Sequence, residues 1–525
     1  MKRSQGIDAI ESRETPWDVV VIGGGATGLG CALEAAARGY DTLLLEMHDF
    51  AKATSSRSTK LVHGGVRYLE QFQVGLVFEA LQERERLQDN APHLVRNLSF
   101  VVPSYKWWEA PYYGIGMKVY DLLAGSQNFG TSRYLNKEKT LEHLPTLEPE
   151  GLTGGIEYFD GQFDDTRLAV NMAQTATEHG GVAVNYMRVT DLTKTNGQVD
   201  GVIAHDWESD TTHEIKAETV INATGIFTDT IREMDDADAQ PTLRPSQGTH
   251  IVLDRSYLPG DSAIMIPKTD DGRVLFAIPW NDRLVVGTTD MPVDDVSHEP
   301  TPTEEEISYL IEHSNRYLAK TLTPDDVLST YAGIRPLVAP PGSSGDTSEI
   351  SRTHQLSVSD SGLVTISGGK WTTYRQMAED TLDEAIDHSG LDKRPSVTGD
   401  LKLHGATENA DQYGDLKHYG ADAPGLQELM DERPELEEQL DERLPIRGAQ
   451  VVWAVRHEMA RAVEDVLARR TRCLLLNAQA SIDIAPRVAE LMAEELDQDD
   501  AWVQNQVDEY TELAEGYLIP ETVMA

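Results

Sequence analysis

The pattern of apolar and polar positions predicts a nucleotide-binding strand–helix–strand unit near the start of the chain. Residues 19–22 are four consecutive apolar residues, which is typical of a strand buried on both faces. Small and apolar residues at 26–37 predict a helix, and the apolar run at 42–45 predicts a second buried strand, which Glu46 closes. This alternation is typical of a parallel sheet in an α/β fold.

Three glycines between the first strand and the helix give this unit its chemistry. Gly23, Gly25 and Gly28 have the spacing G-x-G-x-x-G. In this arrangement the first glycine permits a tight turn, the second lets the backbone approach a pyrophosphate, and the third lets helix and strand pack closely. The helix N-terminus then faces the phosphates, and Glu46 accepts hydrogen bonds from a ribose. The sequence therefore predicts binding of a dinucleotide such as FAD or NAD.

The rest of the pattern divides the chain into further regions. A polar segment at 1–16 is expected to be a loose extension. Short turns join apolar strands at 248–254, 264–267, 273–279 and 284–288, which predicts an antiparallel substrate domain. A late strand at 363–367 leads through Gly368 and Gly369 into a predicted helix, within a discontinuous oxidoreductase region at 17–387. Residues 388–405 read as a linker, and residues 406–525 as a helical domain without chemistry of its own.

The charge balance restricts the possible partners. The 525 residues include 88 acidic and 45 basic side chains, for a net charge of −43. A surface this acidic repels nucleic acid. The acids are spread along the whole chain, which indicates adaptation to concentrated salt, where self-repulsion is screened.

Cysteine content and hydropathy restrict the class further. Cys31 and Cys473 do not form a C-x-x-C pair, so the sequence predicts neither an iron–sulfur cluster nor a structural zinc site, and no metal site is expected. No apolar run approaches the length of a transmembrane helix, and the N-terminus lacks a signal core. A cytoplasmic location is therefore expected, with peripheral association with the membrane as the only form of contact.

Several longer motifs identify a family. The chain resembles the FAD-dependent glycerol-3-phosphate dehydrogenases in the stretches IGGGATGLG, ATSSRSTKLVHGGVRYLE, QGTHIVLD, FAIPWNDRLVVGTTD, YAGIRPL and SGGKWTTYR. These motifs cover residues 17–386, and VVWAVRHEMARAVEDVLARRTR resembles the family's helical cap. The resemblance implies an α/β fold of the D-amino-acid-oxidase type: a Rossmann-like FAD-binding domain, an antiparallel β substrate domain and a C-terminal α-helical domain. It also implies FAD as cofactor and oxidation of sn-glycerol 3-phosphate to dihydroxyacetone phosphate, with a quinone as electron acceptor.

The resemblance and the residue chemistry together suggest the substrate site. A phosphorylated substrate needs fixed positive charge, which arginine provides as a planar fork and lysine as a point charge. His250, Arg335 and Lys370 are the expected catalytic residues: His250 as base, with Arg335 lowering the pKa of the substrate hydroxyl. Substrate-binding residues expected on the same grounds are Arg67, Tyr68, His250, Arg335, Arg352 and Lys370.

The expected cofactor site combines the glycine loop with later segments. A loop rich in hydroxyl groups follows Glu46, and His63 is expected to contact the flavin rather than to act as a base. A buried strand that ends in Ala223-Thr224-Gly225 is expected to close the domain against the cofactor. The full set is Gly23, Gly25, Gly28, Glu46, Thr54, Ser55, Ser56, Lys60, His63, Gly64, Gly225, Gly369, Lys370 and Thr372.

Alternatives remain open at this stage. They are an oxidase of the same fold acting on glycerol 3-phosphate or an amine with oxygen, and a subunit that holds FAD only as an electron relay. A homodimer or partner subunits are also possible. The aromatic segment at 105–123 fits a peripheral contact with the inner membrane surface, a place beneath the C-terminal helices, or a subunit interface.

Overall fold

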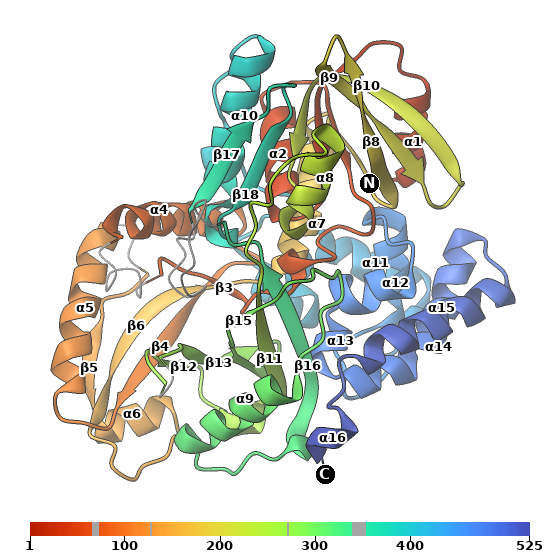
Figure 1. The fold of residues 1–525 in the computed structure, drawn as a ribbon. Helices are drawn as coiled ribbons and strands as arrows, with labels where there is room; N and C mark the ends of the chain where they lie inside the picture. Colours follow the sequence, from red (N-terminus) through yellow and green to blue (C-terminus); the bar gives the residue numbers. More distant parts are fainter. Residues whose placement is uncertain (66–72, 126–128, 270–271, 339–352, 525) are drawn as a thin grey trace.

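The structure is a computed structural model of the whole chain, and it describes residues 1–65, 73–125, 129–269, 272–338 and 353–524. Two large sheets lie one above the other in Figure 1, and a group of helices lies beside the lower sheet. This is the arrangement that the sequence predicts. No helix within the described residues combines the length and the apolar character needed to span a bilayer.

The upper sheet holds the strand–helix–strand unit. Its central strands β1, β2, β7, β10 and β18 are parallel, and the hairpin β8–β9 extends β10 as an antiparallel meander. In spatial order the strands are β17 (His354–Val358), β18 (Val364–Gly368), β10 (Thr211–Asn222), β1 (Trp17–Ile22), β2 (Thr42–Leu45) and β7 (Val182–Val184), with β8 (Met187–Thr195) and β9 (Gln198–Asp206) beside β10.

Strand β1 is buried because its two faces enter two different cores. Val19 and Val21 pack against the helices on one face of the sheet, whereas Val20 and Ile22 pack against the meander on the other. The first core lies under α2 (Ala26–Ala37), α7 (Asp165–Glu178) and α10 (Tyr374–Ser389). A strand with both faces buried reads as a continuous apolar run, so the sequence pattern at 19–22 is accounted for.

The N-terminal segment corrects one expectation. Residues 1–16 do not form a loose extension, because α1 (Arg3–Glu11) packs against β7. Ile10 is buried in the meander core, and the side chain of Arg3 donates to Asp206 over 2.6 Å. These contacts join positions far apart in the chain, so a nine-residue helix without a continuous apolar stripe is held mainly by tertiary interactions.

The lower sheet is mixed and forms the floor of the substrate region. Around β11 the pairing is antiparallel, as predicted, while β12 pairs with β4 in parallel. The spatial order is β15 (Met291–Pro292), β11 (Ser246–Asp254), β14 (Arg283–Gly287), β13 (Leu275–Trp280), β12 (Ala263–Ile266), β4 (Arg96–Ser104), β6 (Gly154–Gln162) and β3 (Leu61–Val62), with β16 (Val327–Arg335) on β11 and β5 (Arg133–Asn136) on β6.

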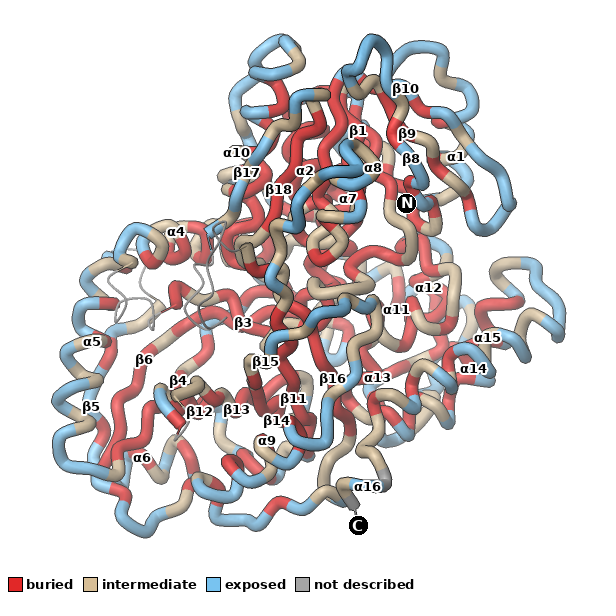
Figure 2. The backbone as a smooth tube through the Cα atoms, in the orientation of Figure 1, coloured by how far each residue is buried: buried red, intermediate tan, exposed pale blue. Residues whose placement is uncertain are grey.

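Helices cover both faces of this lower sheet. Helices α6 (Lys137–His143) and α9 (Glu304–Tyr317) lie on one face, and the C-terminal helices pack against Trp280 and Tyr331 on the other. Figure 2 shows buried backbone continuing from the sheets into the C-terminal region. The C-terminal helices are α11 (Ala423–Glu432), α12 (Gly448–His457), α13 (Cys473–Leu476), α14 (Ala478–Leu496), α15 (Asp500–Glu515) and α16 (Glu521–Met524).

Two further helices line the outer side of the substrate region. The pattern predicts a helix at 69–87; the structure has α4 at Val74–Asn90, and residues 66–72 lie outside the described part. The aromatic segment forms α5 (Glu109–Ala124), on the side of the molecule opposite the C-terminal helices in Figure 1. Residues 388–405 run back over the first domain, where Leu403 donates its amide to the carbonyl oxygen of Asn90.

Candidate functional site

The glycine loop between β1 and α2 forms a cradle that excludes side chains. Gly23 has φ +105°, and a Cβ there would lie 2.8 Å from the carbonyl oxygen of Ala223. A Cβ at Gly28 would overlap the carbonyl oxygen of Gly23, so α2 approaches β1 more closely than any other residue would permit. At Gly25 the added atom would meet Ser55 Oγ at 3.1 Å, at the wall of a cavity. Gly23 and Gly28 therefore have the turn and packing geometry predicted from their spacing, and Gly25 lies in the cavity wall, where its predicted role towards a pyrophosphate stays a prediction.

Glu46 lies beside this cradle at the end of β2. One carboxylate oxygen accepts from the amide of Gly24 over 2.6 Å, and the other accepts from the amide of His48 over 2.8 Å. Burial raises the pKa of the carboxyl, and the two amide bonds oppose that rise. Each oxygen keeps a lone pair beyond its amide bond, so the fixed carboxylate remains able to accept ribose hydroxyls.

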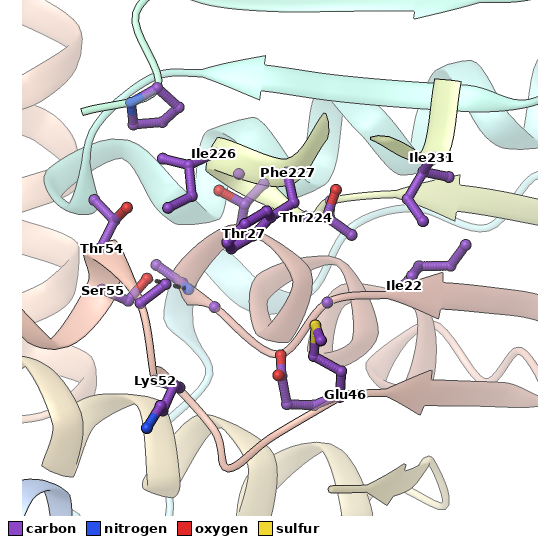
Figure 3. A pocket seen from close by; sticks show the side chains of 18 of the residues that line it. Ile22, Thr27, Glu46, Lys52, Thr54, Ser55, Thr224, Ile226, Phe227 and Ile231 are labelled. Carbon is purple, nitrogen blue, oxygen red and sulfur yellow. Dashed lines mark hydrogen bonds between the residues drawn. The ribbon is translucent and has the colours of Figure 1, made fainter. Parts of the chain in front are cut away.

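A cavity of about 380 Å³ opens in front of the loop (Figure 3). The stick view places Glu46 on one side of it, Thr54 and Ser55 on another, and Thr224, Ile226 and Phe227 across from them. The N-terminus of α2 also opens here, and its amides lack intrahelical partners; Ala26 donates to Ser55 Oγ over 2.9 Å. Glycine backbone, a helix N-terminus and a ribose-accepting carboxylate suit a dinucleotide, so the residues present fit FAD.

A second cavity of about 210 Å³ adjoins the first. The two share the backbone of Gly368 and Gly369 together with Thr54, Lys370 and Trp371. His63, His250, Arg335 and Thr372 line the second cavity but not the first. A cofactor that extends from the first cavity would therefore end beside a small chamber lined by cationic side chains.

His250 lies on β11 in the wall of this chamber. It is 2% exposed, and its Nε2 atom lies 2.9 Å from Oγ1 of Thr59. Its ring stacks on Tyr331 of β16 with a centroid distance of 4.6 Å and an angle of 7° between the planes. Burial, followed by the nearby positive charges of Lys60 and Arg335, lowers the pKa of His250 well below its usual value. The imidazole is therefore neutral at pH 7 and able to accept a proton.

Arg335 ends β16, and its guanidinium lines the same chamber. Its Nη2 donates to Oγ1 of Thr288 over 3.1 Å and to the carbonyl oxygen of Thr289 over 3.0 Å. Its Nη1 lies 3.6 Å from Asp290 Oδ1. These contacts hold the planar fork in one orientation while its charge faces the cavity.

The late glycine pair places Lys370 at the junction of the two cavities and Thr372 in the wall of the second. Gly368 and Gly369 have φ +75° and +81°, values that favour glycine. Lys370 follows them and lines both cavities. Oγ1 of Thr372 accepts from the amide of His63 over 3.1 Å, which joins two segments that the sequence assigns to the flavin.

Some of the expected residues lie elsewhere. Lys60 was expected to contact the cofactor, but its side chain is buried away from both cavities and donates to Asp165 over 2.6 Å. Ser56 and Gly64 also lie outside the cavity walls, and the amide of Gly64 donates to the hydroxyl of Tyr120. Outside the described residues lie Arg67, Tyr68 and Arg352.

Other residues reach the chamber without having been expected there. Thr59 and Arg57 line it, and Arg57 pairs with Glu299 over 2.6 Å. Lys52 lines the first cavity and pairs with Glu464 over 2.6 Å. Their place in the sequence could have indicated them, because all three lie in the same loop as the predicted cofactor residues Thr54 and Ser55.

The C-terminal helices hold the loop at 46–60 from behind. Arg470 donates two bonds to the carboxylate of Asp49, at 2.7 and 2.8 Å, and Arg469 adds a third over 2.6 Å. Arg472 donates to the carbonyl oxygen of Ser56 over 2.8 Å and lies 3.1 Å from Asp165. All three arginines are 2% exposed. The helical region expected to have no chemistry of its own thus supports the cofactor wall.

Comparisons with known proteins agree with this geometry. The family model described as FAD dependent oxidoreductase matches residues 18–375, and the one described as the C-terminal domain of alpha-glycerophosphate oxidase matches residues 364–503. Mitochondrial glycerol-3-phosphate dehydrogenase of Mus musculus is 42% identical over 97% of this chain and 74% of its own length. The Schizosaccharomyces pombe protein of that name is 39% identical over 92% of this chain and 85% of its length.

A solved structure extends the similarity to three dimensions. The glycerol-3-phosphate dehydrogenase from Bacillus halodurans, complexed with FAD, superposes with a TM-score of 0.81. It is 32% identical in sequence, and the match covers 99% of this chain and 98% of that one. The similarity therefore includes both sheets and the C-terminal helices.

Proposed function

Because this chain belongs to the FAD-dependent glycerol-3-phosphate dehydrogenases, we propose that it oxidises sn-glycerol 3-phosphate to dihydroxyacetone phosphate and passes the electrons to a quinone. One observation supports this proposal above all. The nucleotide cavity and the small cationic chamber share the wall formed by Gly369 and Lys370, so a cofactor and a phosphorylated substrate would meet there.

The cofactor-holding groups follow from the first cavity. The glycine loop and the N-terminus of α2 would hold the pyrophosphate, Glu46 would hold a ribose, and Thr54 and Thr372 lie towards the chamber. Bound FAD supplies the hydride acceptor. The protein contributes orientation, positive charge and a proton acceptor.

Arg335 and Lys370 would bind the substrate phosphate. Both line the chamber, and the bonds from Arg335 to Thr288 and Thr289 fix its guanidinium before substrate arrives. A preoriented cation loses little conformational freedom on binding, so more of the interaction contributes to positioning the reacting carbon. His250, neutral and buried against Tyr331, would accept the hydroxyl proton.

Anaerobic mixing tests the reaction. Purified protein loaded with FAD is mixed with sn-glycerol 3-phosphate, and the absorbance of the oxidised flavin is followed. Rapid bleaching is expected, with much slower bleaching by sn-glycerol 1-phosphate or by glycerol, because these lack the correct hand or the phosphate. Equal bleaching by glycerol, or none by sn-glycerol 3-phosphate, would refute the proposed substrate.

A second mixing step tests the acceptor. The reduced protein is divided between an anaerobic solution of short-chain quinone and air-saturated buffer. Reoxidation by quinone is expected to be much faster than reoxidation by oxygen. Stoichiometric peroxide formed at the faster rate would identify an oxidase instead.

A quinone dissolved in lipid requires contact with the bilayer, and α5 offers a surface for it. Trp107, Ile115 and Leu122 are 83%, 70% and 80% exposed. Trp108, Tyr112 and Val119 extend the same exposed face, which we call the α5 face. A surface this apolar marks an interaction site, and its tryptophans and tyrosine suit the headgroup level.

Of the three contacts considered for the aromatic segment, the position of the α5 face is compatible with two, the membrane surface and a subunit interface. It cannot lie beneath the C-terminal helices, which occupy the opposite side of the molecule (Figure 1). Lys118 pairs with Asp121 over 3.3 Å, so its charge is partly neutralised. We propose that this face enters the cytoplasmic surface of the inner membrane mainly through apolar burial, which strong salt does not weaken.

Liposome sedimentation in molar salt tests this contact. Changing Trp107, Ile115 and Leu122 together to Ser should abolish binding to liposomes and reduction of membrane quinone, while activity with a soluble dye remains. Val397→Ser is the control, since Val397 is a large apolar residue that is 49% exposed and lies outside α5. Retained liposome binding by the triple variant, or a change from dimer to monomer in solution, would assign the face to a protein contact.

A further inference from the structure

The hydroxyl of Thr59 lies between the substrate chamber and the proposed base. Thr59 lines the chamber and is half-buried, whereas the Nδ1 atom of His250 is fully buried and has no hydrogen-bond partner among the described residues. The other ring nitrogen, Nε2, lies 2.9 Å from Thr59 Oγ1. Within the described residues, the imidazole therefore has one hydrogen-bond partner, the hydroxyl of Thr59, which belongs to a residue in the chamber wall.

The backbone around Thr59 is fixed from both sides by one carboxylate. Ser58 donates its amide and its hydroxyl to Asp165 Oδ2, at 3.2 and 2.7 Å. Lys60 donates its ammonium to the same oxygen over 2.6 Å and has φ +63°, a left-handed conformation that is costly for a residue with a side chain. Strained positions of this kind persist where surrounding contacts enforce them, and they cluster at functional sites.

The imidazole is equally constrained. Its stacking on Tyr331 and its 2% exposure leave little room for rotation. The charged groups that act on it are Lys60, Arg335 and Asp165, and the two cations disfavour a permanent positive charge on the ring. A neutral ring that uses Nε2 as an acceptor carries its proton on Nδ1.

We propose that Thr59 is a catalytic residue that relays the substrate's hydroxyl proton to Nε2 of His250. The inference rests on the proposed function. The substrate O–H bond breaks as its proton moves to Thr59 Oγ1, and the proton that Thr59 already carries moves to Nε2. The electron pair left on the substrate oxygen would form the carbonyl, with bound FAD as the acceptor of the C2 hydride. His250 ends as an imidazolium, and the proton returns to solvent in the next stage of the cycle.

Two variants at one position test the relay in the FAD-loaded protein. Thr59→Val keeps the shape but removes the hydroxyl, and Thr59→Ser keeps the hydroxyl. General acid–base groups contribute about 10²- to 10⁴-fold, so Thr59→Val should slow the limiting rate of anaerobic flavin reduction by about that factor. The apparent Kd for sn-glycerol 3-phosphate should stay within about threefold, because Thr59 carries no charge, and Thr59→Ser should recover most of the rate.

A spectroscopic readout tests the same bond without turnover. In protein labelled with ¹⁵N-histidine, the shifts of His250 should show a neutral ring protonated on Nδ1, with an Nε2 shift that changes in Thr59→Val. A wild-type ring protonated on Nε2, a Thr59→Val rate equal to wild type, or a Thr59→Ser rate as low as that of Thr59→Val would overturn the relay. Failure of wild-type flavin to bleach would instead refute the proposed substrate, and the ¹⁵N shifts would still decide the hydrogen bond.

Discussion

Two glycines of the same loop should fail for different reasons when they gain a side chain. At Gly25 a Cβ meets only the movable hydroxyl of Ser55 at 3.1 Å, but further methyl groups would enter the cofactor cavity. At Gly28 a Cβ would overlap the carbonyl oxygen of Gly23, which is backbone and cannot move alone. Gly25→Val should therefore affect cofactor binding, whereas Gly28→Ala should affect the fold.

The magnitudes separate the two cases. A cofactor present at 100 times its Kd stabilises the folded state by about 2.7 kcal/mol. Gly25→Val should lose this stabilisation with little change in the apoprotein. Gly28→Ala forces α2 away from β1, and overpacking of this kind costs about 1–3 kcal/mol with or without FAD.

Thermal unfolding with and without FAD measures both effects. The wild type should show a clear rise in Tm on adding FAD, Gly25→Val should show none, and Gly28→Ala should start from a lower apoprotein Tm. The reasoning is refuted if Gly25→Val purifies with a full complement of FAD, or if both variants lower the apoprotein Tm equally.

Three further predictions concern charge. Arg335→Lys and Lys370→Ala should each lower kcat/KM for sn-glycerol 3-phosphate by about ten- to a few-hundred-fold, since a charged hydrogen bond contributes about 1.5–3 kcal/mol, while the much slower reaction with glycerol changes little. With a net charge of −43, the Tm should rise as KCl approaches molar concentrations, and a flat or falling Tm would contradict salt adaptation. Burial lowers the pKa of His404, but its bonds to Asp422 and Glu178 raise it further, so the folded-state pKa lies above the usual value. The contribution of His404 to the free energy of unfolding should therefore be complete below pH 6.5 and be lost as pH rises through the folded-state pKa. Denaturant titrations should show this loss in the wild type and not in His404→Gln.

The sequence predicted those parts of the site whose signal is local. Gly23, Gly28 and Glu46 lie within one strand–helix–strand unit, so their spacing alone indicates how they meet. His250 was placed correctly on a strand, because a family motif and the apolar pattern at 248–254 coincide there.

Long-range contacts explain what the sequence did not show. Lys60 turns inward because its ammonium lies 5.4 Å from the ring centres of both Trp280 and Tyr331 and reaches Asp165. These partners are 105 to 271 residues away along the chain, and the local pattern of apolar residues cannot predict contacts between positions so far apart. Thr59 was missed for a related reason: its role depends on a histidine 191 positions later, on strand β11.

The arginines behind the cofactor wall impose an order on biosynthesis. During translation, Asp49 and Ser56 are synthesised more than four hundred residues before their partners Arg470 and Arg472. Until the last helices emerge, the buried carboxylate of Asp49 lacks these guanidinium groups, and unpaired buried charge is strongly unfavourable. The nascent enzyme is therefore expected to remain without flavin until synthesis is almost complete, so that chains truncated before residue 470 are released colourless.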